Sequence, residues 1–136
     1  MSFTCRDNRI NSIDLTACPE IKYLYCSHNL ITSLDVSKNT ALILLGCQHN
    51  KLKHLDVSTN TVLQELDCRN NLLASLNASN NESIKRIECD NNQLHDLRVY
   101  GCTKLKEMFC SYNKLTSLNV KGCTMLEYLK FDTIFR

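Results

Sequence analysis

The sequence predicts a solenoid of about six stacked turns that share one hydrophobic core and contribute seven strands to a curved parallel sheet. The first observation is a cysteine that recurs at an unvarying interval of 21 residues. The second is that asparagine and aliphatic residues recur at fixed offsets from each of these cysteines. The third is that neither the period of a helix nor the alternation of a simple strand explains these columns. Six ladder cysteines define the turns: Cys5, Cys26, Cys47, Cys68, Cys89 and Cys110.

Each turn is expected to begin with a strand around the cysteine, in which two inward side chains bracket an outward one. In Leu66-Asp67-Cys68, for example, the leucine and the cysteine point inward. Strands of successive turns should lie parallel and ~4.8 Å apart. The expected strands lie near residues 3–5, 24–26, 45–47, 66–68, 87–89, 108–110 and 129–131.

An asparagine follows three residues after every ladder cysteine, where the chain must turn out of the strand. Its side chain is expected to bond backbone groups that the bend leaves unpaired. The column comprises Asn8, Asn29, Asn50, Asn71, Asn92 and Asn113.

The opposite side of each turn is expected to be short extended or 3₁₀ segments, because too few residues remain for a helix. Leu34-Asp35-Val36, for example, alternates in, out and in. Thirteen residues after a ladder cysteine, one column holds either asparagine or cysteine, which favours a compact structural turn. We expect two of its cysteines, Cys102 and Cys123, to be less buried than the ladder. The column comprises Cys18, Asn39, Asn60, Asn81, Cys102 and Cys123.

The short signature of the unit is L-x-x-L-x-C-x-x-N-x-L, as in residues 63–73. It resembles the leucine-rich repeat, with cysteine in place of the third leucine. The whole chain resembles the 21-residue cysteine-ladder subclass found in bacterial surface proteins of the internalin J type. The resemblance implies a leucine-rich-repeat solenoid, an α/β horseshoe by convention but rich in β-structure here. We expect residues 1–136 to form one such domain.

The nine cysteines are expected to be reduced and mostly buried, acting as small hydrophobic residues. Stacked parallel side chains suit neither the dihedral angle of a disulfide nor the converging ligands of a zinc site. His28 and His49 share a column with Asp7, but we favour an exposed binding surface over a metal site there. No phosphate-binding loop, Ser-His-Asp set or Cys-His nucleophile stands out. We therefore expect no metal, no cofactor and no enzymatic activity.

A formal net charge of +2 without a basic stripe argues against a nucleic-acid partner. No run reaches the length of a membrane span, so membrane insertion is not expected. The first residues lack the apolar stretch of a secretory signal. This predicts a cytoplasmic or host-delivered protein, with a cell-surface or secreted location as the alternative for a fragment.

The outward strand residues and their neighbours form the expected concave face, whose identities the repeat leaves free. Apolar and aromatic residues gather near its two ends, as in a protein-binding hot spot. Between them lie charged residues such as Glu65, Asp67 and Arg86, expected as solvated cross-strand pairs. The predicted function is recognition of a protein or peptide on this face. The candidate contacts are Tyr23, Tyr25, His28, Ile43, Leu44, His49, Phe109, Tyr112 and Tyr128.

The ends of the repeat array give the alternative function. Phe3 stands in the leucine column and Phe131 in the cysteine column, and no polar cap is recognisable. Met1 and Phe3 at one end, and Ile134 and Phe135 at the other, are candidates for closing the array locally. Uncapped turns expose core and strand edges. The alternative is thus a structural or adhesive segment of a longer array, or end-to-end self-association, which light scattering would detect.

Overall fold

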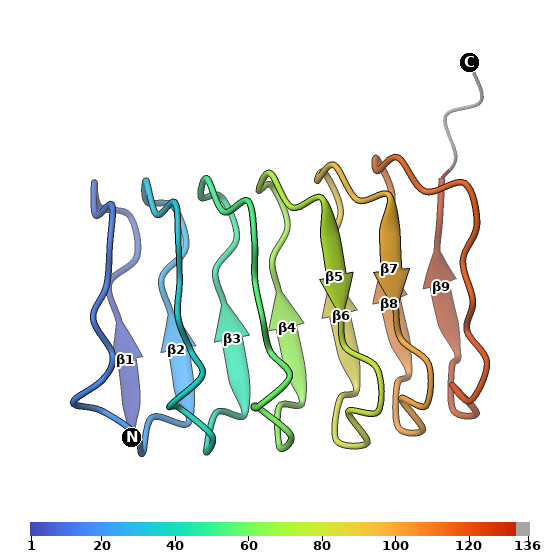
Figure 1. Ribbon diagram of the computed structural model, residues 1–136, viewed down its shortest axis with the longest axis horizontal. Coiled ribbons are helices and arrows are strands. Elements are labelled where there is room, and N and C mark those ends of the chain that lie inside the picture. The colour runs from blue at the N-terminus through green and yellow to red at the C-terminus, as the bar shows by residue number, and fades with distance from the viewer. Residues whose placement is uncertain (133–136) are drawn as a thin grey trace.

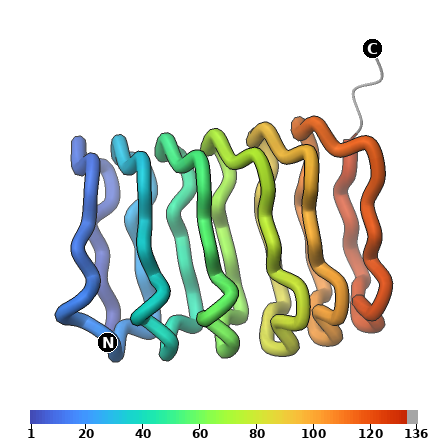
Figure 2. The backbone as a smooth tube through the Cα atoms, viewed as in Figure 1, coloured from blue at the N-terminus to red at the C-terminus, as the bar shows by residue number. Residues whose placement is uncertain are grey.

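A computed structural model describes residues 1–132, which form a stack of similar turns from one end of the molecule to the other (Figures 1 and 2). One strand from each turn enters a seven-stranded parallel sheet in the order β1-β2-β3-β4-β6-β8-β9. The predicted solenoid and its seven-stranded sheet are therefore confirmed. The strands are β1 (Ser2–Thr4), β2 (Tyr23–Tyr25), β3 (Leu44–Gly46), β4 (Glu65–Asp67), β6 (Arg86–Glu88), β8 (Glu107–Phe109) and β9 (Tyr128–Lys130).

The strands begin and end one residue before the predicted positions, so each ladder cysteine follows its strand. The inward leucine stands at the centre, as Leu24 does in β2. The cysteine still takes part in the hydrogen-bond ladder, since the Cys26 amide donates to the Gly46 carbonyl at 2.9 Å. The strand ends at the preceding residue because the chain turns immediately after the cysteine.

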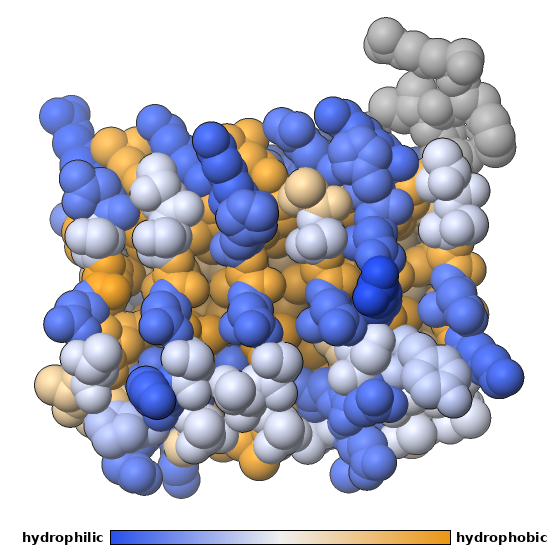
Figure 3. Space-filling view, viewed as in Figure 1, coloured by the Kyte–Doolittle hydropathy of each residue, from blue (hydrophilic) through white to orange (hydrophobic). Residues whose placement is uncertain are grey.

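The side opposite the sheet is extended, as expected, and part of it is more regular than the sequence suggested. Strands β5 (Ser75–Asn77) and β7 (Asp96–Arg98) pair in parallel, and Arg98 bridges to Asn119. Figure 1 shows these strands in front of β6 and β8. Figure 3 shows this face, where a hydrophilic row lies between hydrophobic bands. Residues 1–132 contain no helix long and apolar enough to cross a membrane.

The core is a set of columns that run the length of the solenoid between the two sides. Leu45 and Leu66 at strand centres pack into it, as do Leu42 and Leu63, which stand three residues earlier in the turn before each strand. Each is at most 1% exposed. Because a single turn cannot cover its own inward face, every turn depends on its neighbours for this burial.

The asparagine column ties each turn to the one before it. The Nδ2 of Asn50 donates to the carbonyls of Cys26 and Cys47, both at 3.0 Å. Its Oδ1 accepts from the amide of Ile31 at 3.0 Å. One buried side chain thus satisfies backbone groups of two successive turns, which the bend would otherwise leave unpaired.

The column thirteen residues after each ladder cysteine also bonds the previous turn, whether it holds asparagine or cysteine. The Nδ2 of Asn60 donates to the Val36 carbonyl at 3.1 Å. In the later turns the Sγ of Cys102 donates to the Ala78 carbonyl at 3.0 Å, and Cys123 bonds Val99 at 3.2 Å. The expectation that these two thiols are less buried than the ladder is wrong for Cys102, which is 0% exposed because it reaches inward to the previous turn. It is right for Cys123, which is 9% exposed, whereas the buried ladder cysteines are at most 1% exposed.

Burial falls at the two ends of the described array. Cys5 in the first turn is half-buried, whereas the next five ladder cysteines are buried. Leu129 in β9 is 41% exposed, although the same column is fully covered in β2 and β3. The predicted end-closing residues Ile134 and Phe135 lie outside the described residues. End-to-end self-association stays a prediction.

Thiol labelling is expected to separate the nine cysteines by their position in the fold. All nine are free, and only Cys5 and Cys18 are not buried. We expect a thiol reagent to modify Cys18 and Cys5 rapidly in the native protein, and all nine cysteines in denaturant. Mass spectrometry would identify the modified sites, and Cys18→Ser should remove one fast phase. Rapid native labelling of Cys68 would contradict this burial pattern.

Candidate functional site

The outward residues of β2 and β3 form a cluster of large side chains on the sheet face. Tyr23 pairs in register with Leu44, and Tyr25 with Gly46. Tyr23 is 38% exposed, and Tyr25 and Leu44 are half-buried. Ile43, one residue before β3, is also half-buried and accepts backbone bonds from the next turn. We call Tyr23, Tyr25, Ile43 and Leu44 the tyrosine–leucine cluster.

A pocket of about 150 Å³ adjoins this cluster over Gly46. Tyr25 and Leu44 form one part of its lining, and Gln48 and Glu65 form another. The Arg6 guanidinium lies 4.4 Å from the centre of the Tyr25 ring at this site. The Oε1 of Gln48 is buried and has no hydrogen-bond partner. The pocket therefore combines an aromatic wall with an unsatisfied acceptor.

The middle of the sheet face is covered by a network of ion pairs. Arg69 bonds Asp67 at 2.7 Å and contacts Glu88 at 3.1 Å. Arg86 bonds Glu88 at 2.7 Å and reaches across to Glu107 on β8. These partly exposed pairs stabilise the fold only modestly. The pairing also affects recognition, because charges that already satisfy one another attract a charged partner less strongly than free charges do.

A second group of aromatic residues lies at the far end of the sheet. The rings of Phe109 on β8 and Tyr128 on β9 are 5.2 Å apart and inclined at 37°. The Arg86 guanidinium lies 5.0 Å from the centre of the Phe109 ring. Tyr128 is 52% exposed. We call Phe109 and Tyr128 the terminal aromatic pair.

The structure places His28, His49 and Tyr112 in the turn after the strand, at the edge of the sheet. Their φ angles are 54°, 55° and 55°, in the left-handed region. Asn and Asp tolerate this region best, and they fill the other three positions of the column, Asp7, Asn70 and Asn91. The rings of His28 and His49 stack at 4.2 Å. Desolvation lowers the pKa of His49, and the neighbouring His28 is the second cause of this shift. These three residues are therefore separate from the tyrosine–leucine cluster.

The cysteine ladder is unsuited to nucleophilic chemistry. Burial raises the pKa of Cys26 to about 12, and burial likewise raises that of Cys110 to about 12. The reactive form of cysteine is the thiolate, which such a pKa suppresses at neutral pH. Among residues 1–132, no group of three or more His, Cys, Asp or Glu side chains is arranged to hold a metal ion.

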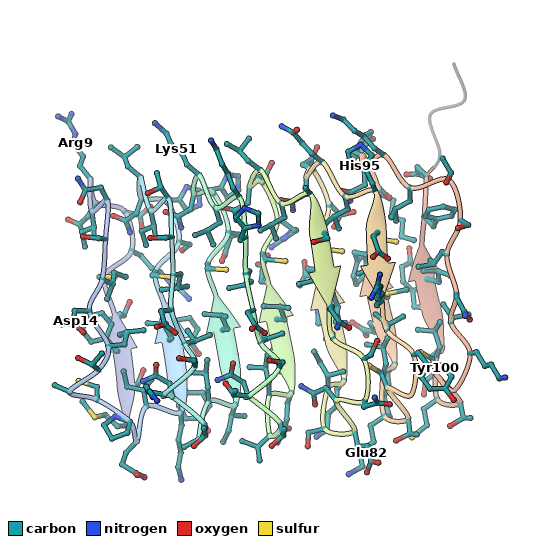
Figure 4. The ribbon with its side chains drawn as sticks, viewed as in Figure 1. Arg9, Asp14, Lys51, Glu82, His95 and Tyr100 are labelled. Atoms are coloured by element: carbon teal, nitrogen blue, oxygen red, sulfur yellow. The ribbon has the colours of Figure 1, made fainter. Side chains whose placement is uncertain are left out.

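The sequence predicted Tyr25 and Leu44 as contacts but not the pocket beside them. The positions of Arg6 over Tyr25 and of the unpaired Gln48 acceptor depend on side-chain conformation across neighbouring turns. The repeat does place both residues in one column, because Arg6 directly follows Cys5 and Gln48 directly follows Cys47. The strand residues Tyr25 and Gly46 belong to the same part of the repeat. Figure 4 shows the opposite face, where His95 and Tyr100 are found.

Comparison with known proteins identifies the scaffold. No protein-family model and no curated protein matches the sequence. The structure is similar to that of the functional domain of InlJ from Listeria monocytogenes, which includes a cysteine ladder. The TM-score is 0.92 at 30% sequence identity, and the match covers 96% of this chain but 29% of the InlJ chain. The chain therefore has the fold of a leucine-rich-repeat solenoid with a cysteine ladder, built from 21-residue repeats similar to those of the internalin domain.

Proposed function

We propose that the chain is a non-enzymatic module that recognises a protein or peptide through the sheet face, with the tyrosine–leucine cluster as its anchor. The observation that carries this proposal is the pairing of Tyr23 with Leu44 on adjacent strands, beside the pocket over Gly46. Large side chains next to a concavity are typical of the residues that dominate binding energy at interfaces. The similarity to an internalin repeat domain supports the same class of function.

The scaffold beneath the cluster is suited to this role because it is already ordered. Leu24 and Leu45, the inward neighbours of the cluster, are fully buried, and backbone bonds join β2 to β3. A preorganised surface loses little conformational entropy when a partner binds. The tyrosines add wide contact area with few rotatable bonds, so they also lose little entropy.

The terminal aromatic pair provides a second contact on the same face. It begins at β8, four strand positions from β2 in the sheet order. At the usual strand spacing this separation is ~19 Å. A partner that touches both groups must cross the ion-pair network, so we expect polar or charged residues in its middle.

Replacing Tyr25 by alanine together with Leu44 by serine is expected to abolish binding of peptides selected on the native sheet face. The substitutions remove the anchor but leave the inward columns intact, so the melting temperature should change little. The measurement is selection of a displayed random-peptide library against the native chain, followed by titration of the enriched peptides against both proteins.

The matched control replaces Tyr100 by alanine and Val62 by serine. These residues are 50% and 43% exposed and lie outside the cluster and both of its strands. Selected peptides should bind this control as they bind the native chain. Equal binding to the native chain and the Tyr25→Ala, Leu44→Ser variant would show that the cluster is not the anchor.

A further inference from the structure

The glycine at position 46 is not required by the backbone. Its φ lies outside the left-handed region, unlike those of Gly101 and Gly122 at +75° and +84°. An added Cβ would lie 3.3 Å from Gln48 Oε1, the end of a flexible side chain, and 3.6 Å from Tyr25. Glycine inside a strand weakens it and often marks a place where another group approaches closely. What Gly46 provides here is the empty space above it.

The groups around that space are suited to a hydrogen-bond donor with a positive charge. Gln48 Oε1 is an acceptor without a donor, although it is buried. Glu65 is exposed and forms no ion pair within residues 1–132. Leaving a buried acceptor unpaired is unfavourable, so a ligand that donates to it gains affinity.

The neighbouring strands carry a local excess of negative charge, although the whole chain has a formal charge of +2. From β4 to β8, five carboxylates outnumber four cationic side chains on and beside the strands. The carboxylates are those of Glu65, Asp67, Glu88, Asp90 and Glu107, and the cations are Arg69, Lys85, Arg86 and Lys106. Arg69 and Arg86 already pair with Asp67, Glu88 and Glu107, so Glu65 is the pocket carboxylate that would attract a positively charged partner group.

We propose that the pocket over Gly46 receives the guanidinium of an arginine side chain from the protein partner, an inference that rests on the proposed function of the sheet face. The planar group stacks on Tyr25 and donates to Glu65 and to Gln48 Oε1. Arginine fits this site better than lysine because its flat, forked guanidinium both stacks on a ring and bonds a carboxylate.

Arg6 supports this assignment and also limits the affinity. Its guanidinium already lies against the Tyr25 ring, so this ring accepts that group in the fold. Arg6 also lines the pocket and is a like charge for an incoming arginine. Removing its charge should therefore strengthen binding of the partner's arginine.

The test is an NMR titration of the isotope-labelled full chain with N-acetyl-arginine amide. We expect shifts concentrated at the Gly46 backbone amide and the Gln48 side-chain amide, with a Kd on the order of 1 mM for a ligand this small. N-acetyl-citrulline amide, which is neutral but of similar shape, should bind about tenfold more weakly, since hydrogen bonds to charged groups are stronger. N-acetyl-lysine amide should also bind more weakly.

Substitutions at the pocket locate the binding. Gly46→Ala should abolish the shifts while the melting temperature stays the same or rises, because alanine reduces the freedom of the unfolded chain. Glu65→Gln should weaken binding and Arg6→Gln should strengthen it. Glu82→Gln is the matched control, since it changes the net charge as Glu65→Gln does, but Glu82 (labelled in Figure 4) does not line the pocket.

The results distinguish this inference from the proposed function. Equal binding of citrulline or lysine amide, or full binding by the Gly46→Ala variant, would overturn the arginine assignment. If arginine amide causes no shifts while selected peptides still require Tyr25 and Leu44, only the pocket inference is wrong. If arginine amide binds but no peptide depends on the cluster, the proposed anchor is wrong instead.

Discussion

Replacing Asn71 by alanine is expected to lower the free energy of unfolding by about 3–5 kcal/mol, because it leaves several buried backbone groups unpaired. Asn71 Nδ2 donates to the carbonyls of Cys47 and Cys68, both at 3.1 Å. Its Oδ1 accepts from the Leu52 amide at 3.0 Å. Alanine supplies neither a donor nor an acceptor, and the turn is too well covered for water to replace them. Urea denaturation followed by circular dichroism would measure the loss.

The same substitution at the first turn is the matched control. Asn8 is exposed, and its side chain bonds only the carbonyls of its own turn, those of Cys5 and Arg6. Water can satisfy those groups, so Asn8→Ala should cost less than about 1 kcal/mol. Equal losses at Asn71 and Asn8 would mean that the bonds between turns do not carry the effect.

Replacing Leu66 by alanine is expected to cost about 2–5 kcal/mol, the usual range for removing a buried leucine side chain. Leu66 is 1% exposed at the centre of β4, and the turns on both sides pack against it. In a stacked array, each turn is stabilised mainly by its nearest neighbours. The cavity therefore weakens two contacts between turns at once. For a domain whose total stability is on the order of 10 kcal/mol, such a loss is large.

Leu129→Ala tests this explanation in the same column. Leu129 stands at the centre of β9, but it is 41% exposed because no described turn follows it. The expected loss is about 1 kcal/mol, since less apolar surface is uncovered and no closed cavity forms. If Leu129→Ala destabilised the chain as much as Leu66→Ala, burial between two turns would not be the source of the effect.

Much of the fold could be predicted because inward residues repeat with the turn. The leucine at each strand centre and the asparagine after each strand have the same neighbours in every inner turn, so one copy predicts the others. The predicted strand bounds are wrong by one residue. The ladder cysteine still bonds the next strand, but the chain turns directly after it, so the strand ends at the residue before it. The error for the burial of Cys102 has another origin. Its column accepts two residue types, and the thiol satisfies the same carbonyl position as the amide.

The candidate site was less predictable, because outward residues do not repeat. Tyr25 and Leu44 could be predicted as contacts from their outward positions and residue types alone. The register of their strands follows from the 21-residue period. The left-handed backbone of His28 and Tyr112 was not anticipated, and it moves both residues from the sheet face into the turn. The network around Arg86 depends on which of several carboxylates its guanidinium reaches.

The sequence by itself determined the period, the inward columns and the seven-stranded sheet, because every turn must bury the same face against the next. Only the tertiary structure decided which outward residues act together. It brought Arg6, Tyr25, Gly46 and Gln48 to one pocket, although they come from three successive turns. It also left one buried acceptor there without a partner. The reason is that outward side chains meet across turns by conformation and available space, which no repeating column specifies.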